Sequence, residues 1–337
     1  MRAYIIRRLL LIPPTLFGIT LLVFTITRLV PGGPLEQALA EAQSMEAGGG
    51  GGGGRNMALS EEQLDQLREY YGFDKPIVVS YFDWLGKILR GDFGTSLRYQ
   101  DPVLGMILDR VPIALYFGLV TAIITYLISI PLGIFKALKH RSHSDNISSI
   151  LVFGGYAVPG YALGSLLVVF VCLRWGWFPA RGWPESDFES MNLWGRIVDL
   201  SQHTAMPLVC YLLGSFAFTT MLMKNQLMDN LAADYVRTAV AKGLSFRQAV
   251  VRHAFRNSLI PIATTLGQLI TIFVGGSFLI EVIFDIDGIG LLGFKSLIDR
   301  DYTVVMGILT ITAALMLLGN LISDIIVASV DPRVKFK

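Results

Sequence analysis

The chain has 337 residues, of which 53% are hydrophobic and 16% are charged, and its formal net charge is +2. A typical soluble domain carries about 25% charged residues, so the composition excludes a water-soluble globule of this length. The near-neutral charge gives no indication of nucleic-acid binding. Cys172 and Cys210 both lie inside long apolar runs, which argues against a structural disulfide or a zinc site.

Six apolar stretches are long enough to cross a membrane. A hydrocarbon core about 30 Å thick needs about 20 apolar residues as a helix. The sequence therefore predicts an all-α integral membrane protein with six spans, at residues 9–30, 113–135, 147–173, 204–223, 261–284 and 303–328. Arg28, Glu281 and Asp324 lie near span ends, where they can reach polar surroundings. For Asp324 we prefer a structural ion pair to a functional role.

The first span has to be distinguished from a signal peptide. Arg2, Arg7 and Arg8 form a basic start, and Ala38-Leu39-Ala40 resembles a cleavage site. The apolar run, however, has about 22 residues, whereas the apolar h-region of a typical signal peptide has only roughly 7–15. We therefore expect a retained transmembrane helix.

Lys and Arg are unevenly distributed between the connecting segments. With the N-terminus in the cytoplasm, the inner segments hold 15 Lys and Arg in 65 residues; they are residues 1–8, 136–146, 224–260 and 329–337. The outer segments hold 12 in 130 residues; they are residues 31–112, 174–203 and 285–302. Because basic residues are enriched on the cytoplasmic side, both termini are predicted to be cytoplasmic.

The first outer segment, residues 31–112, follows residues 1–30 and precedes a predicted core domain at 113–337. It contains an unbroken glycine run, Gly48–Gly54, which we interpret as a flexible spacer. Ser60-Glu61-Glu62-Gln63 has the form of a capping box and predicts a helix that Gly72 ends. A second amphipathic helix is expected over 77–89. The segment is predicted to be a small scaffold on the periplasmic face.

Two glycine-containing pairs interrupt predicted spans. Pro159-Gly160 lies in the third span and Gly275-Gly276 in the fifth. Such pairs kink helices or allow them to approach closely. Both packing and a hinge or pathway-lining role remain open for them.

The inner loop 224–260 is too organised for a simple connector. Residues 234–242 predict a short helix that Gly243 ends, and Ser245-Phe246-Arg247-Gln248 is another capping box. A second helix is expected over 249–258, with Pro261 at its end. This helix–glycine–helix elbow suits docking into a partner's groove, but an amphipathic connector on anionic lipid is an equal alternative from the residues alone.

Two sequences in this loop point to a known family: Asp234-Tyr-Val-Arg-Thr-Ala-Val-Ala-Lys-Gly-Leu-Ser245 and Arg252-His-Ala-Phe-Arg-Asn-Ser-Leu-Ile-Pro261. They resemble the EAA-type loop of ABC importer permeases, in particular of the B-type subunit of dipeptide and oligopeptide permeases. Arg237-Thr238-Ala239 stands where the motif has Glu-Ala-Ala, a variation common in the peptide branch, while Gly243 is kept.

The resemblance extends over nearly the whole chain. Further family marks are Tyr4-Ile-Ile-Arg-Arg-Leu-Leu-Leu-Ile-Pro13, Pro31-Gly-Gly-Pro34, Gly91-Asp-Phe-Gly-Thr-Ser96 and Asp331-Pro-Arg333. Asp285-Ile-Asp-Gly-Ile-Gly290 replaces a more usual Trp-Pro-Gly-Ile-Gly ending, and this change resembles the Yej-type branch. That branch is associated with peptides and microcin-C-like peptide antibiotics.

The resemblance implies the type I ABC importer permease fold in a bacterial inner membrane. It implies a homologous second permease, ATP-binding cassette ATPase subunits and a periplasmic peptide-binding protein as partners. The chain itself would hold no cofactor, metal or catalytic residue, and ATP and Mg²⁺ would bind to the ATPase subunits. Contact with the ATPase falls on eight residues: Asp234, Tyr235, Arg237, Thr238, Ala239, Lys242, Gly243 and Leu244.

Other signals carry less weight. Gly288-Ile-Gly-Leu-Leu-Gly293-Phe-Lys295-Ser296 resembles a phosphate loop, but Phe294 breaks the spacing. His140 and His143, three apart in a basic inner loop, are interpreted as solvated, since they are not accompanied by a set of carboxylate or cysteine ligands. His253 lies on the elbow and could contact a partner.

Two other classes of function fit the sequence less well. A membrane enzyme predicts convergent polar groups within the spans, and few are present. A secondary transporter predicts broken helices with ionisable residues near the midplane, for which Asp324 lies too near a span end. Neither class requires the elbow.

Overall fold

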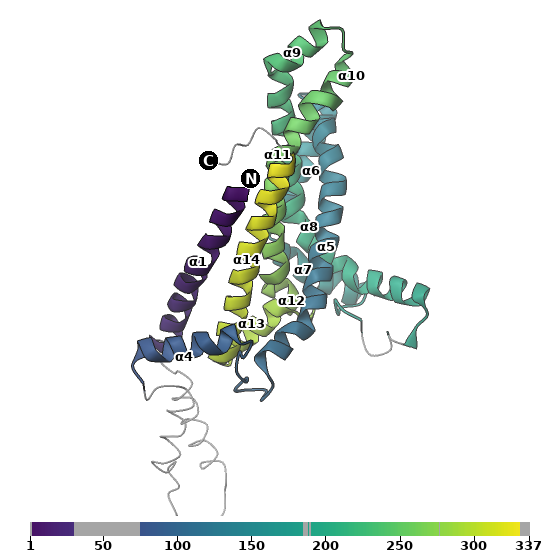
Figure 1. Ribbon diagram of the computed structural model, residues 1–337. Helices are drawn as coiled ribbons and strands as arrows, with labels where there is room; N and C mark the ends of the chain where they lie inside the picture. The colour runs from purple at the N-terminus through teal and green to yellow at the C-terminus, as the bar shows by residue number, and fades with distance from the viewer. Residues whose placement is uncertain (1, 30–74, 185–187, 189, 276, 331–337) are drawn as a thin grey trace, which may run out of the picture. The chain divides into compact units, whose positions relative to one another are not determined.

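The computed structural model describes residues 2–29, 75–184, 188, 190–275 and 277–330 (Figure 1). Its helices are α1 (Arg2–Leu29), α4 (Ile77–Leu89), α5 (Val103–Leu138), α6 (His143–Ala157), α7 (Gly160–Leu167), η1 (Val168–Arg174), α8 (Leu193–Ala232), α9 (Asp234–Ala241), α10 (Phe246–Ala249), η3 (Val250–Phe255), α11 (Arg256–Gly275), α12 (Phe278–Ile283), α13 (Ile289–Ile298) and α14 (Tyr302–Val330). Apart from an isolated bridge between Thr95 and Pro102, the described part of the chain is helical or irregular. The predicted all-α class is confirmed.

Most of the predicted spans are found as long apolar helices. Four are long and apolar enough to cross a membrane: Ile5–Leu29 of α1, α5, α8, and Tyr302–Ile326 of α14. A bent pair, His143–Ala157 with Gly160–Arg174, makes a fifth if it counts as one span. The predicted span 261–284 falls on two helices, α11 and α12. Residue 276, which lies between them, is outside the described residues. The count of six therefore stays a prediction.

The chain divides into two compact units. Unit 1 comprises Met1–Leu10, Arg110–Leu291 and Leu315–Lys337, and unit 2 comprises Leu11–Asp109 and Leu292–Ala314. The first and last long helices therefore each contribute to both units, a division different in its bounds from the one expected from the sequence. The glycine run and the helix predicted after the first capping box lie outside the described residues.

Unit 2 contains the amphipathic helix α4, whose predicted bounds of 77–89 are confirmed. Tyr81 is only 1% exposed, and its hydroxyl shares a 2.9 Å hydrogen bond with that of Thr20 in α1. Its ring meets those of Phe17 and Phe24 edge-on, each at 5.5 Å between centroids. The aromatic residues of α4 thus fix it against α1.

The Gly91–Ser96 mark has a structural role in unit 2. The buried Ser96 hydroxyl donates a hydrogen bond to the carboxylate of buried Asp301. The same carboxylate accepts from the backbone N–H of Val304 at 3.3 Å, in the first turn of α14. Such a bond satisfies one of the free N–H groups at a helix start, so this motif positions the start of α14.

In unit 1, small residues bring α5 and α8 into close contact. A Cβ atom on Gly133 would lie 2.6 Å from Cβ of Met223 and 2.9 Å from the Thr220 carbonyl oxygen. Nearby, the Ser129 hydroxyl donates to the carbonyl of Phe216 at 3.1 Å. Only glycine fits at such an approach, and small residues serve the same purpose at helix contacts in membranes generally.

The interruption at Pro159-Gly160 is a sharp bend. The helices on either side meet at 87°, and Val158 has an extended backbone with φ −90° and ψ 119°. Proline disfavours the helical conformation for the residue before it, which explains the break. A Cβ on Gly160 would lie 2.8 Å from the Cys210 carbonyl oxygen in α8, so the glycine serves close packing. Residue 276 of the second pair lies outside the described residues.

One predicted helix boundary is wrong. Pro261 does not end the second helix of the elbow but lies inside α11, which continues to Gly275. An internal proline costs a hydrogen bond and about 3 kcal/mol in an isolated helix. Here α11 packs along α8, and packing of this kind maintains proline-containing helices in membrane bundles.

Candidate functional site

The elbow, residues 224–260, includes the last turns of α8, which ends at Ala232. Ala233 has an extended backbone (φ −72°, ψ 145°), and this single residue separates α8 from α9. The elbow has two limbs: the end of α8 with α9, and α10 with η3 and the start of α11. Asn230 connects them, because its side-chain N–H donates to the Ser258 hydroxyl at 3.0 Å and its side-chain oxygen accepts from the hydroxyl of Tyr235. The three polar side chains hold the turn between α8, α9 and α11 in one arrangement.

Gly243 ends α9 in a Schellman motif. The Gly243 N–H donates to the Val240 carbonyl at 2.9 Å, and the Leu244 N–H donates to the Ala239 carbonyl at 3.2 Å. This pair of bonds defines the motif and requires a positive φ at the glycine, which is +96° here. The predicted stop is confirmed.

The predicted capping box at the elbow's second limb is also present. The Ser245 hydroxyl accepts from the Gln248 N–H at 3.3 Å, and the Gln248 side chain accepts from the Ser245 N–H at 3.1 Å. The helix then continues without interruption through α10, the π-helical segment η3 and α11. Gly243 and Ser245 together make a tight, fixed tip between α9 and α10.

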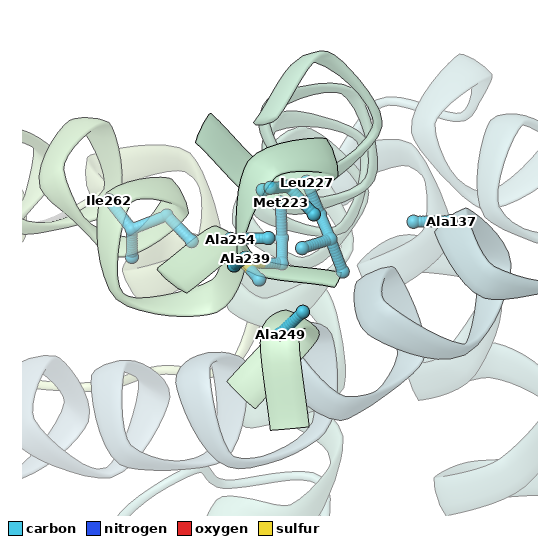
Figure 2. Close-up of a cluster of buried hydrophobic side chains, with 8 residues drawn as sticks. Ala137, Met223, Leu227, Ala239, Ala249, Ala254 and Ile262 are labelled. Atoms are coloured by element: carbon cyan, nitrogen blue, oxygen red, sulfur yellow. The ribbon is translucent and has the colours of Figure 1, made fainter. Parts of the chain in front are cut away.

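The elbow has a core of its own (Figure 2). The buried members of this core come from α5, α8, α9, α10, η3 and α11 and include several alanines: Ala137, Met223, Leu227, Val236, Ala239, Ala249, Ala254 and Ile262. Ala249 and Ala254 are 0% exposed and Ala239 is 8% exposed. Small side chains let the two limbs of the elbow pack closely, so the elbow is a folded element and not a loose connector.

The residues predicted to contact a partner fall into two groups. Asp234, Tyr235, Arg237, Thr238, Lys242 and Gly243 are exposed, and Leu244 is half-buried and packs against the elbow core. Ala239 lies inside that core. Its position in the motif therefore reflects packing of the limbs, and its side chain does not reach the surface.

The exposed elbow surface also includes residues that the sequence reasoning missed. Four apolar side chains and four cations form it: Tyr235, Val240, Phe246 and Val251 with Arg237, Lys242, Arg247 and Arg252. Phe246 and Val251 are each 58% exposed and Val240 is 41% exposed. The 3.6-residue period accounts for the exposure of Val251, which lies opposite Ala249. It does not account for Val240, four residues after Val236, or for Phe246, three residues before Ala249, because residues at these spacings share a face. Exposed apolar groups surrounded by polar ones mark interaction sites.

The base of the elbow is held by a buried charge cluster, Lys136–Asp145–Lys224, from α5, α6 and α8. Nζ of Lys224 lies 2.8 Å from both carboxylate oxygens of Asp145, and Nζ of Lys136 lies 3.0 Å from Oδ1. All three residues are buried, with exposures of 0% for Lys136, 2% for Asp145 and 7% for Lys224.

The surroundings of the cluster compensate for burying its charges. Lys136 also donates to the Asp145 carbonyl and to the hydroxyls of Ser148 and Ser149, at 2.7–3.0 Å. Asp145 lies in the first turn of α6, where the helix dipole favours a negative charge. Lys224 immediately follows Met223 of the elbow core, so the cluster connects the α5–α6 turn to the start of the elbow.

The histidines and Asp324 have the following positions. His140, His143 and His253 are all exposed, which agrees with the interpretation of His140 and His143 as solvated; Nδ1 of His140 also lies 3.5 Å from Asp145. Nε of Arg8 lies 3.0 Å from Asp324, which confirms a structural ion pair. Among the described residues, no cluster of three or more His, Cys, Asp and Glu side chains could hold a metal ion.

The segment that resembles a phosphate loop surrounds a carboxylate instead. Glu281 of α12 is 3% exposed, and its carboxylate accepts from the Leu291 N–H at 2.6 Å at the start of α13. Cβ atoms on Gly288 or Gly290 would come within 2.6–3.0 Å of that carboxylate. The glycines therefore make room for a side chain of the same chain.

Enlarging Ala239 should disrupt the elbow without adding a surface feature. We expect Ala239→Leu to lower the free energy of unfolding by about 1–3 kcal/mol, as overpacked cores typically do. The measurement is the thermal unfolding of the purified protein in detergent. The control is Thr238→Leu at the neighbouring exposed position, which should leave the transition unchanged. Equal effects of both variants would contradict the assignment of Ala239 to the core.

Comparisons with known proteins agree with this architecture. Residues 129–336 match the family described as "Binding-protein-dependent transport system inner membrane component". The chain is 40% identical, over 100% of both sequences, to the "Inner membrane ABC transporter permease protein YejB" of Escherichia coli O157:H7. It is 39% identical to the "Peptidoglycan transport system permease protein YejB" of Agrobacterium fabrum, over 100% of this chain and 99% of the relative. It is 36% identical to the "Oligopeptide transport system permease protein AppB" of Bacillus subtilis, over 100% of both.

Proposed function

The chain belongs to the family of inner membrane components of binding-protein-dependent transport systems, and from this premise we propose that it is a permease subunit of an ATP-driven peptide importer. The relatives are permease proteins of ABC and oligopeptide transport systems by name. The chain is thus the membrane component of such a system and not its ATPase. ATP and Mg²⁺ bind to separate ATPase subunits.

The exposed elbow surface is the observation that supports a coupling role. Tyr235, Val240 and Phe246 present apolar contacts at the tip of a rigidly packed element, and Arg237 and Lys242 border them. A partner that rearranges on binding ATP can act on such an element through contacts that differ between its two states. The exposed residues among the predicted contacts, from Asp234 to Gly243, would meet the ATPase directly, while Ala239 and Leu244 would support them from within the elbow core.

The assembly would place the elbow in the cytoplasm and residues 31–112 on the periplasmic side. The excess of Lys and Arg in the inner segments supports this orientation. A homologous second permease would complete the translocation pathway, and a periplasmic binding protein would deliver the substrate. These partners follow from the class of transport system to which the family belongs.

The substrate class is proposed to be peptides: oligopeptides, dipeptides or microcin-C-like peptides. One relative carries oligopeptide transport in its name and another carries peptidoglycan transport. Peptidoglycan fragments contain short peptides, so both names are compatible with one chemical class. Uptake of labelled oligopeptides and of peptide-containing peptidoglycan fragments should be compared in the same cells.

The proposal is tested by co-purification from the native membrane in mild detergent. A tagged wild-type chain should bring with it a second permease and P-loop ATPase chains. Val240→Glu, which puts a charge into the exposed elbow surface, should reduce ATPase recovery roughly tenfold, corresponding to a loss of about 1.4 kcal/mol.

Val240→Thr is the matched control, because threonine has nearly the shape of valine and no charge. It should retain the ATPase, and both variants should still recover the second permease. A wild-type chain that purifies alone would overturn the importer assignment. Full ATPase recovery with Val240→Glu would show that the contact lies elsewhere on the chain.

A further inference from the structure

Helix α8 is longer than a membrane span. Its 40 residues correspond to about 60 Å at 1.5 Å per residue, twice the roughly 30 Å of a hydrocarbon core. The predicted span occupies 204–223, which leaves residues 193–203 beyond its outer end. We call residues 193–203 the arm; Figure 1 shows it in teal, leading away from the other helices of unit 1.

The arm has an exposed apolar face. Leu193 is 76% exposed, Trp194 73%, Ile197 49% and Val198 37%. Their spacing of i, i+1, i+4 and i+5 places them on one side of a helix. Ser201 lies on the same side, but its hydroxyl is bonded to the Ile197 carbonyl, so this face offers no free polar group of its own.

The opposite side of the arm is polar and is covered by the chain itself. Nε of Arg196 donates to the Met191 carbonyl at 3.1 Å, and its guanidinium lies over the ring of Phe188. Asp199 pairs with His203 at 3.3 Å. Met191 and Phe188 of the segment before α8 thus contact the polar side, and the apolar side is left uncovered by the described residues of unit 1.

A second group of exposed aromatic residues lies in the segment between η1 and α8. Trp175 and Trp177 follow directly after η1 and are 53% and 68% exposed; their rings lie 4.8 Å apart between centroids, with planes inclined at 37°. The chain then returns to α8, where a Cβ on Gly182 would lie 2.9 Å from Pro207. Tryptophan is enriched at membrane–water interfaces, where its ring is apolar and its N–H is polar, so Trp175 and Trp177 mark the level of the outer headgroups.

We propose that the arm is an interfacial anchor whose apolar face lies in the outer leaflet of the bilayer. Three observations favour lipid over water or a protein partner: the apolar face is free of charges, it carries a tryptophan, and it continues from the membrane end marked by Trp175 and Trp177. An amphipathic helix of this kind buries its apolar face about 5–10 Å into the headgroup and acyl boundary. The inference goes beyond the proposed function and requires only that α8 spans the membrane.

The anchor gives α8 two different ends. One end lies in the interface through the arm, and the other carries the elbow with its own core. A lipid-held outer end limits axial sliding of α8, so movement imposed at the elbow would tilt the helix about the arm.

The test is the depth of single spin labels in the assembled transporter. Cys172 and Cys210 are buried and would be replaced by alanine, with uptake confirmed before single cysteines are placed at Trp194 and Ile197. The complex is reconstituted in nanodiscs of phosphatidylethanolamine and phosphatidylglycerol. Accessibility to oxygen, which enters lipid, and to a nickel chelate, which stays in water, is then compared.

Ile123, 63% exposed in the middle of α5, provides the hydrocarbon reference, and exposed His143 at the start of α6, outside the predicted ATPase contact, provides the aqueous one. Labels at 194 and 197 should give oxygen-to-nickel ratios between these two references. Ratios equal to that at 143 would overturn the anchor in favour of water. Protection from both reagents would overturn it in favour of a protein contact. Neither result affects the importer assignment, which uptake measures separately.

Discussion

Gly243→Val should abolish most peptide uptake while leaving the protein in the membrane. Gly243 has φ +96°, and the two hydrogen bonds that end α9 depend on that conformation. A residue with a Cβ atom pays about 1–2 kcal/mol in left-handed backbone, and β-branched valine is especially disfavoured there. A cost near 1.4 kcal/mol makes the Schellman turn at residue 243 tenfold less favoured relative to other conformations of the turn. Uptake should therefore fall roughly tenfold or more. The readouts are uptake and ATP hydrolysis in reconstituted vesicles, whose ratio reports coupling.

Backbone strain, and not steric overlap, should cause this loss. Apart from its two chain neighbours, no heavy atom of the described residues lies within 4 Å of a Cβ placed on Gly243, so the added Cβ itself meets no steric overlap. Gly243→Asn is the matched control, because asparagine tolerates left-handed backbone better than valine does. It should retain more uptake than Gly243→Val. Wild-type uptake and coupling in the valine variant would contradict the role assigned to the elbow.

Asp145→Asn should destabilise the protein by about 3–5 kcal/mol, the usual cost of removing one partner from a buried ion pair. The substitution keeps the shape of the side chain but leaves the ammonium groups of Lys136 and Lys224 buried without a counter-charge. Lys136 retains its two serine hydroxyls, whereas Lys224 loses its carboxylate partner. Thermal unfolding in detergent and the amount of protein in the membrane are the measurements.

The control for this prediction is Asp83→Asn. Asp83 pairs with Lys75 at 2.7 Å, but both side chains are about half exposed, at 52% and 46%. Exposed pairs of this kind contribute about 0–1 kcal/mol. A double variant, Asp145→Asn with Lys224→Met, removes one of the two uncompensated ammonium groups and should recover part of the lost stability. Equal stability of Asp145→Asn and the wild type would contradict the structural importance of the cluster.

The sequence predicted those features that depend on neighbouring residues. The ends of the elbow's helices follow from Gly243 and from the Ser245–Gln248 box, and the structure places both as expected. The bend at Pro159 and the bounds of α4 were also predicted correctly. Each of these depends on interactions within about five residues, so the local sequence contains the necessary information.

Contacts between distant residues could not be predicted in this way. Asp145 and Lys224 are 79 positions apart, and each taken alone reads as a solvated charge at a span end. The continuation of α11 through Pro261 and the burial of Ala239 both depend on packing against other helices. For Ala239 the motif indicated the right position, but only the packed elbow distinguishes a supporting residue from a contacting one.

The sequence by itself determined the all-α membrane class, most of the spans, the elbow and the family, because hydrophobic length, helix caps and motif spacing are properties of contiguous residues. The tertiary structure decided which elbow residues are exposed, how the buried Lys136–Asp145–Lys224 cluster holds its base, and that the arm of α8 leaves an apolar face uncovered. Burial and charge pairing arise only when segments far apart in the chain meet, since a side chain's surroundings are set by its neighbours in space.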